Sequence, residues 1–199
     1  MCVTVVKGYN MADKVAVFCD FNGVVNVPKT MLYSLHTVEA SEGLFNVDSE
    51  LIVNLTVSGK KYDDTKLEFS SNMVEELNRF ACSVPNVWYW LSSWRNALVD
   101  VVDSVGLKFP AQVAEWLSFQ EEGFGFKLST VKSFMTKNPN MPVIWVDDVA
   151  VDMNVSWWEG VTNVTPLLVK PNTFTGLSVS DLDAMYAYSA RHCNVNVAV

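Results

Sequence analysis

Short apolar runs that end on polar or turn-forming residues are the feature that most constrains this sequence. Val15–Cys19 is rich in valine and leads directly into Asp20-Phe-Asn-Gly. A continuous apolar run of this length is typical of a strand that is buried on both faces, as in a parallel sheet. The same pattern recurs at Val87–Leu91, Val143–Val146 and Leu167–Val169. We therefore expect these runs to be the strands of a mostly parallel sheet.

Segments with helical spacing of apolar residues lie between these runs. One extends to Ala81 from Asn72, which we interpret as the helix cap, with Glu75 three residues later. The others are Arg95–Val105, Leu128–Thr136 and Val179–Arg191. Alternating strands and helices predict a doubly wound, Rossmann-like α/β fold.

One segment departs from this alternation. Leu51–Val57 alternates apolar and polar residues, a Ser-Gly-Lys turn follows, and Lys66–Phe69 returns, which predicts a β-hairpin inserted after the first strand. With 199 residues and no Pro/Gly/Ser-rich linker, we expect one domain over 1–199 without a large cap domain. Residues 1–12 are interpreted as a flexible N-terminal arm, with Met11 as an alternative start.

Cysteine, histidine and charge restrict the function classes. The four cysteines form no C-x-x-C pair, and the two histidines are His36 and His192, so we expect neither a zinc site nor a Ser-His-Asp triad. A net charge of −8 disfavours non-specific binding to nucleic acid. No apolar run approaches the ~20 residues of a membrane span, and we expect a cytoplasmic protein without a membrane partner. Because cysteine and histidine sites are not expected, we expect any catalytic chemistry to depend on carboxylates.

Acid and hydroxyl residues follow three of the expected strands. Because ligands bind beyond the carboxyl ends of strands in open α/β sheets, Asp20, Ser92 and the pair Asp147-Asp148 should converge. A carboxylate in that position can attack phosphorus and form an aspartyl-phosphate. Such chemistry needs a hard cation such as Mg²⁺, for which Asp147, Asp148 and Asp152 are candidate ligands.

The same residues resemble the motifs of the haloacid-dehalogenase-like (HAD) superfamily. VAVFCDFNGVVN is similar to its first motif, a hydrophobic strand followed by D-x-D-G-[TV]. YWLSSW resembles the second motif, with Ser92 as the phosphate-binding hydroxyl, and Lys127 in FGFKLSTV matches the lysine of the third. VIWVDD, with Asp152 four residues on, resembles the acidic fourth motif. The motifs occur in the family's order from Val15 to Asp152.

A closer likeness is to the HAD domains associated with bacterial and phage RNA-repair proteins. The shared patterns are a W-x-T-x-W strand end, a K-L-x-x-V helix, a W-[IV]-D-D strand and a late T-G-L, which correspond here to Trp90–Trp94, Lys127–Val131, Trp145–Asp148 and Thr175–Leu177. This resemblance implies a phosphorylated substrate such as a nucleotide or a nucleic-acid end. It also implies the host cytoplasm as the location if the chain is phage-encoded.

The resemblance implies a role for each site residue. Asp20 becomes the nucleophile, and the catalytic set is Asp20, Asn22, Ser92 and Lys127. The implied substrate-binding residues are Gly23, Ser92, Ser93, Arg95 and Lys127. The implied Mg²⁺ ligands are Asp20, Asn22 through its backbone carbonyl, Asp147, Asp148 and Asp152.

Asn22 departs from the family pattern. The hydrolases carry there an aspartate that protonates the leaving group and then activates water, and an amide can do neither. Loss of general acid–base assistance slows such reactions by roughly 10² to 10⁴. Three explanations remain open: a slow or specialised phosphotransferase, a natural non-catalytic binder, or an engineered substitution. The alternative to an enzyme is therefore a catalytically silent HAD-fold binding protein.

Several residues also have ordinary structural interpretations. Lys127 by itself predicts a solvated helix residue, and Asp152 suits the first turn of a helix. The tryptophan-rich stretches Trp88–Trp94 and Trp157-Trp158 favour core packing over a base-stacking platform.

Few residues are available for a cap, so we expect an open site, with Phe45 or Tyr62 of the hairpin region as a flap over a small phosphate ester.

Overall fold

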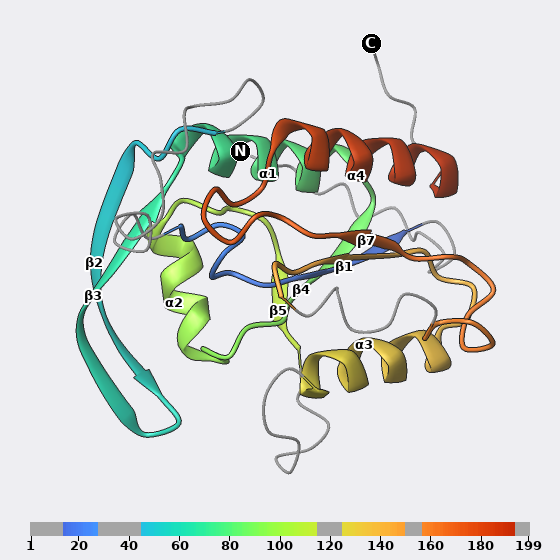
Figure 1. Cartoon of the computed structure of the whole chain (residues 1–199), viewed down its shortest axis with the longest axis horizontal. Coiled ribbons are helices and arrows are strands. Elements are labelled where there is room, and N and C mark those ends of the chain that lie inside the picture. Colours follow the sequence, from blue (N-terminus) through green and yellow to red (C-terminus); the bar gives the residue numbers. More distant parts are fainter. Residues whose placement is uncertain (1–13, 28–44, 115–124, 150–156, 194–199) are drawn as a thin grey trace.

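The computed structural model describes residues 14–27, 45–114, 125–149 and 157–193 (Figure 1). The elements in chain order are β1 (Val15–Cys19), β2 (Ser49–Val57), β3 (Lys60–Phe69), α1 (Ser71–Ser83), β4 (Asn86–Trp90), α2 (Ala97–Ser104), β5 (Ala111–Val113), α3 (Gly125–Lys137), β6 (Val143–Val146), β7 (Leu167–Val169) and α4 (Val179–His192). The expected N-terminal arm, His36 and Asp152 lie outside the described residues.

A five-stranded parallel sheet forms the centre of the fold, in the order β5-β4-β1-β6-β7. β1 is the middle strand, where Val17 is in register with Trp88 of β4 on one side and with Ile144 of β6 on the other. The predicted mostly parallel α/β architecture is confirmed. The short edge strand β5 was not predicted, because its three residues are half-exposed or exposed and carry no apolar run.

Helices cover both faces of this sheet (Figure 1). Alternate residues of β1 point to opposite faces, and Val15, Val17 and Cys19 join one core cluster with buried residues of α1, α2 and α4. Ala16 and Phe18 join a second cluster with buried residues of α3. A strand that is buried on both faces must be apolar at every position, which explains the continuous run in the sequence.

The predicted β-hairpin is present as the antiparallel pair β2–β3, which forms a separate two-stranded sheet. It stands beside the main body of the molecule in Figure 1 and is longer than the sequence pattern indicated. Leu55, Leu67 and Phe69 join the core cluster of α1, α2 and α4. The backbone amide of Val27, after β1, donates to the carbonyl of Glu68 at 2.7 Å. The hairpin is thus attached to the loop that follows the central strand.

The strand order creates one place where a ligand is expected. The chain passes from β1 outward to β4 and β5, then returns to the other side of β1 as β6 and continues to β7. The order reverses between β1 and β6. The crevice beyond the carboxyl ends of two such strands is the usual ligand position in doubly wound folds.

Two smaller predictions have different outcomes. The predicted cap Asn72 is wrong: α1 begins at Ser71 and is capped by Ser70, whose hydroxyl accepts a hydrogen bond from the amide of Met73. Of the tryptophan-rich stretches, Trp88 and Trp90 are almost completely buried, so core packing is confirmed for these two. Within the described residues, no helix has the length and apolar character needed to span a membrane.

Candidate functional site

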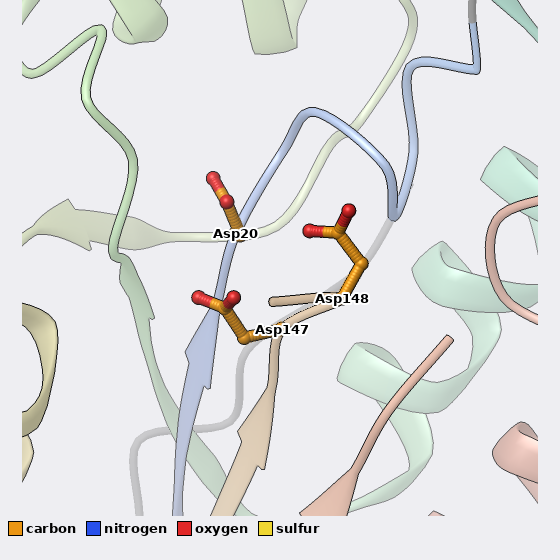
Figure 2. Close-up of side chains that lie close together, drawn as sticks. All are labelled: Asp20, Asp147 and Asp148. Carbon is orange, nitrogen blue, oxygen red and sulfur yellow. The ribbon is translucent and has the colours of Figure 1, made fainter. Parts of the chain in front are cut away.

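Three aspartates lie close together at the reversal point of the sheet (Figure 2). Asp20 directly follows β1, and Asp147 and Asp148 directly follow β6. One carboxylate oxygen of each lies within 4.8 Å of the others, and the three residues are 8 %, 0 % and 6 % exposed, respectively. The predicted convergence of Asp20 with the Asp147-Asp148 pair is therefore present in the structure.

Lys127 completes this charged cluster from the first turn of α3. Its side chain is only 3 % exposed, and its Nζ donates to Asp20 Oδ2 and, at 2.7 Å, to Asp147 Oδ2. The interpretation of Lys127 as a solvated surface residue is therefore wrong. We define Asp20, Lys127, Asp147 and Asp148 as the carboxylate–lysine cluster.

Backbone amides orient the two carboxylates that contact the lysine. Phe21 N donates to Asp20 Oδ1 at 2.7 Å, and Val149 N donates to Asp147 Oδ1 at 3.1 Å. Each carboxylate thus has one oxygen on a backbone amide and the other on Lys127. Charged hydrogen-bonding groups held in this way keep one orientation and need little rearrangement when a ligand enters.

Burial is the largest influence on the pKa values of Asp20 and Asp148. It raises the pKa of Asp20 from 3.8 to about 6, because the opposing effect of Lys127 only partly offsets the loss of water, and the nearby Asp147 raises it further. Burial alone would lower the pKa of Lys127, but the attraction of Asp20 and Asp147 outweighs it and the pKa is raised. The pKa of Asp148 is also raised by burial, despite a hydrogen bond with Thr173 that lowers it. One lysine ammonium group therefore lies among three buried carboxyl groups.

Gly23 makes room for the third acid. Its φ is +73°, and a Cβ at this position would lie 2.2 Å from Asp148 Oδ2. No side chain fits there. The part of Gly23 in the site is therefore the close approach of its backbone to Asp148, and not a side-chain contact with a ligand. A second glycine supports the same loop, since a Cβ on Gly176 would lie 2.6 Å from the carbonyl oxygen of Val24. The Thr-Gly-Leu segment thus packs against the loop after β1, and Leu177 N donates to Val24 O at 3.1 Å.

The loop after β4 carries the expected phosphate-binding residues. Leu91 N donates to Cys19 O at 2.8 Å, which holds this loop beside the end of β1. Ser92 is buried and its Oγ accepts from Trp94 N at 3.4 Å, whereas Ser93 is exposed. Arg95 has a φ of +51°, an unusual conformation for an arginine. The structure places Ser92, Ser93 and Arg95 beyond the strand next to β1, and their binding role stays a prediction.

A pocket of about 230 Å³ lies between this loop and the hairpin. Its described lining residues are Leu55, Val57, Tyr62, Thr65, Ser93 and Trp94. Of the two predicted flap residues, Tyr62 borders the pocket, and Phe45 packs against the hydrophobic core. The pocket is mainly apolar, with hydroxyl groups from Thr65 and Ser93.

Asn22 forms part of the loop between Asp20 and Gly23 and is half-buried. Its Oδ1 accepts a hydrogen bond from Asn26 Nδ2 at 2.8 Å. Neither Asn26 nor Thr173, the partner of Asp148, was identified from the sequence. Polar residues are common in loops, so the sequence alone does not single out Asn26 or Thr173. Their contacts, with Asn22 and Asp148 respectively, are what distinguish them. Asp152, the remaining predicted metal ligand, lies outside the described residues.

The donor set of the cluster fits a hard divalent cation. Asp20, Asp147 and Asp148 offer carboxylate oxygens only, and these are the ligands that Mg²⁺ prefers over nitrogen or sulfur. Three buried acids with one lysine also leave an excess of negative charge that a bound cation would neutralise. The arrangement can thus hold a cation, a nucleophilic carboxylate and a fixed positive charge at one strand edge.

Comparison of the chain with protein-family models, with curated proteins and with solved structures found no match in any of the three.

Proposed function

We propose that this chain is a Mg²⁺-dependent phosphoryl-transfer domain of the haloacid-dehalogenase-like type, a phosphatase or phosphohydrolase that acts through an aspartyl-phosphate on Asp20. The observation that carries the proposal is the buried carboxylate–lysine cluster at the reversal point of a parallel sheet. The order of the family's motifs along the chain supports it. The parallel sheet and the inserted hairpin agree with a family fold that lacks a large cap.

Asp20 is the best-placed nucleophile of the three acids. It follows the central strand, and its Oδ1 is held by Phe21 N while its Oδ2 contacts Lys127. In the proposed reaction, an oxygen of Asp20 forms a bond to phosphorus and the ester P–O bond breaks. Lys127 keeps a positive charge beside the oxygens that become negative, and preorganised charge of this kind is a large contribution to catalysis.

Asp20, Asp147 and Asp148 are the described residues that would hold Mg²⁺, together with the proposed backbone carbonyl of Asn22. When bound, the ion would neutralise the negative charge on the phosphate and on the acids. Lys127 already contacts Asp20 and Asp147, so the chain itself orients these two carboxylates. Asp148 is oriented separately, by Thr173.

Asn22 affects both halves of the proposed reaction. The departing oxygen needs a proton, and water must lose one before it attacks the aspartyl-phosphate, but an amide neither donates nor accepts a proton in this way. We therefore propose that hydrolysis is impaired by roughly 10² to 10⁴ relative to a variant with a carboxylic acid at this position. With an aryl phosphate, whose leaving group departs without protonation, the intermediate should form and then accumulate, because its hydrolysis is slow.

Turnover of an aryl phosphate with and without Mg²⁺ tests this function. We expect Asn22→Asp to raise the Mg²⁺-dependent rate and Asp20→Asn to abolish it. Asp103→Asn, which changes an exposed aspartate of α2, is the control for loss of one negative charge. Equal rates in all three variants would contradict the assignment of Asp20.

A catalytically silent binding protein is the second candidate, and Asn22 is the observation that favours it. Such a protein would bind Mg²⁺ and phosphate without forming a covalent bond. Mg²⁺-dependent stabilisation by beryllium fluoride, which mimics an acylphosphate on aspartate, supports chemistry at Asp20. Stabilisation by phosphate alone, without a response to beryllium fluoride, would favour the binder.

The substrate class is proposed from the resemblance to RNA-repair domains. We propose a nucleotide or a nucleic-acid phosphate end, acted on in the cytoplasm. Tyr62 and Trp94 help to line the apolar pocket and offer aromatic surface for a base. Trp94 lies two residues after Ser92 in the chain. A panel of nucleotides, 3′- and 5′-phosphorylated oligonucleotides and sugar phosphates distinguishes these classes. A preference for sugar phosphates would contradict the proposed class while leaving the chemistry intact.

A further inference from the structure

Asn26 is a buried polar residue that connects the loop after β1 to the hairpin. It is 3 % exposed. Its Oδ1 accepts from the backbone amide of Glu68 at 2.9 Å, and its Nδ2 donates to Asn22 Oδ1 at 2.8 Å. The adjacent backbone bond from Val27 N to Glu68 O, at 2.7 Å, fixes the same two segments against each other. Both ends of the Asn26 amide are therefore in use.

These contacts determine which end of the Asn22 amide remains for a ligand. A backbone amide can only donate, so the Asn26 atom that faces Glu68 N must be the oxygen. The other end of Asn26 is then the NH₂ group, which can only donate, so Asn22 must present its oxygen to it. The NH₂ group of Asn22 points away from Asn26, and among the described residues it has no hydrogen-bond partner.

We infer that Asn26 is a positioning residue, which fixes the Asn22 side chain so that its NH₂ group serves as a hydrogen-bond donor to an anionic oxygen ligand such as phosphate. The inference rests on the proposed function, since it concerns the ligand of the same site. Asn22 lies two residues from Asp20 and next to Gly23, which touches Asp148. A donor at this position complements a phosphate oxygen, whereas an oxygen in the same place would repel it.

The same contacts explain how position 22 can accept either an amide or an acid. An aspartate at position 22 would also accept from Asn26 Nδ2, so the geometry that Asn26 imposes is preserved in Asn22→Asp. The wild-type chain therefore keeps a site shaped for an acid but offers a donor instead. This arrangement favours retention of an anion over its release.

Asn26→Asp is the variant that reverses this orientation. One oxygen of the new carboxylate still accepts from Glu68 N, but the other can no longer donate to Asn22. The Asn22 amide is then expected to turn over and to direct its oxygen toward the ligand. We expect the affinity for inorganic phosphate in the presence of Mg²⁺, measured by calorimetry, to fall about tenfold, as for loss of one hydrogen bond to a charged group.

A double-mutant cycle separates this effect from the added negative charge. In the Asn22→Ala background no amide remains to turn over, so Asn26→Asp should weaken phosphate binding clearly less than in the wild-type background. An equal loss in both backgrounds would overturn the inference. Asp20→Asn is measured in parallel: if phosphate binding depends on Asp20 but the cycle shows no coupling, the inference fails while the proposed function stands.

A measurement on the unmodified protein keeps the inference testable if Asn26→Asp does not fold. In a spectrum of the side-chain amides, the Asn26 NH₂ protons should be protected from exchange, because they are buried and bonded to Asn22. The Asn22 NH₂ signals should shift when phosphate and Mg²⁺ are added. Protected Asn22 protons that do not respond to phosphate, or an unprotected Asn26 NH₂ group, would overturn the assignment.

Discussion

Two regions at the carboxyl ends of the strands differ from each other. We call the region beyond β1 and β6 the first edge, and the region beyond β4 the second edge. At the first edge, three acids and Lys127 are buried together. Lys127 contacts Asp20 and Asp147, and a backbone amide donates to each of these two acids. At the second edge, Ser93 is exposed, Arg95 has a positive φ, and a pocket opens toward the hairpin. The first edge holds charged side chains in fixed positions, and the second edge borders a pocket. We infer that reactivity resides at the first edge and recognition at the second.

Removal of Lys127 should have the largest effect on the first edge. Lys127→Met keeps the length of the side chain but leaves Asp20 and Asp147 without their shared cation. Breaking a buried ion pair in this way typically costs about 3 to 5 kcal/mol in the free energy of unfolding. Urea denaturation near neutral pH measures it, and Lys132→Met on an exposed position of the same helix is the control. Equal stability of the two variants would show that the cluster is not held together by charge.

Lowering the pH should relieve the excess of negative charge at this edge. Because the pKa of Asp20 is raised from 3.8 to about 6, mainly by burial, the folded protein retains a proton between these values that the unfolded chain has lost. The free energy of unfolding should therefore fall as the pH rises through this window, by roughly 1 to 3 kcal/mol. Asp20→Asn should remove this component of the pH dependence. Mg²⁺ requires the ionised acid, so stabilisation by Mg²⁺ should grow over the same window, and an unchanged profile in Asp20→Asn would refute the assignment.

Gly23 and Gly160 test how tightly the first edge is built. Both have a positive φ, but a Cβ on Gly23 would overlap Asp148, whereas no atom of the described residues lies within 4 Å of a Cβ on Gly160. Gly160→Ala should cost only the backbone strain, about 1 kcal/mol. Gly23→Ala should cost about 1 to 3 kcal/mol more, because it must also displace a buried carboxylate, and should weaken Mg²⁺ binding. Similar losses in the two variants would mean that Asp148 moves freely.

The smallest effect on stability is expected at the second edge. Ser92→Ala should change the free energy of unfolding by less than about 1 kcal/mol, since among the described residues the Oγ of Ser92 has one hydrogen bond, a long one of 3.4 Å from Trp94 N. It should nevertheless weaken Mg²⁺-dependent phosphate binding about tenfold. Ser93→Ala is the comparison and should weaken phosphate binding less, because Ser93 is exposed whereas Ser92 is buried. A larger loss of phosphate binding in Ser93→Ala would shift the binding role to the second serine.

The sheet was predictable because burial on both faces leaves a simple pattern. Val15–Cys19 and Val143–Val146 are apolar at every position, and their predicted limits agree with the observed strands. The start of α1 was misplaced at Asn72 because serine and asparagine are similar helix caps, and only the contact between Ser70 and Met73 decides between them. The three half-exposed or exposed residues of β5 gave no signal.

The candidate site was predictable in its charged residues but not in their partners. Asp20 and Asp147 follow apolar strands, and parallel strands bring their carboxyl ends together, so chain position indicated that the acids converge. Lys127 was indicated only by the resemblance to the HAD motifs. The burial of Lys127 and the contacts of Asn26 and Thr173 depend on how α3, the hairpin and the loop before α4 pack onto the sheet. These are long-range contacts, which local sequence patterns do not encode.

Covalent labelling of Asp20 is the most direct test of the central claim. The protein is incubated with an aryl phosphate, with and without Mg²⁺, quenched in acid and analysed by intact mass and peptide mapping. We predict Mg²⁺-dependent addition of one phosphoryl group to Asp20, which persists because Asn22 cannot activate water and which is absent in Asp20→Asn. The absence of any phosphoryl adduct, in a protein that binds Mg²⁺ and phosphate, or an adduct on another residue, would contradict the account.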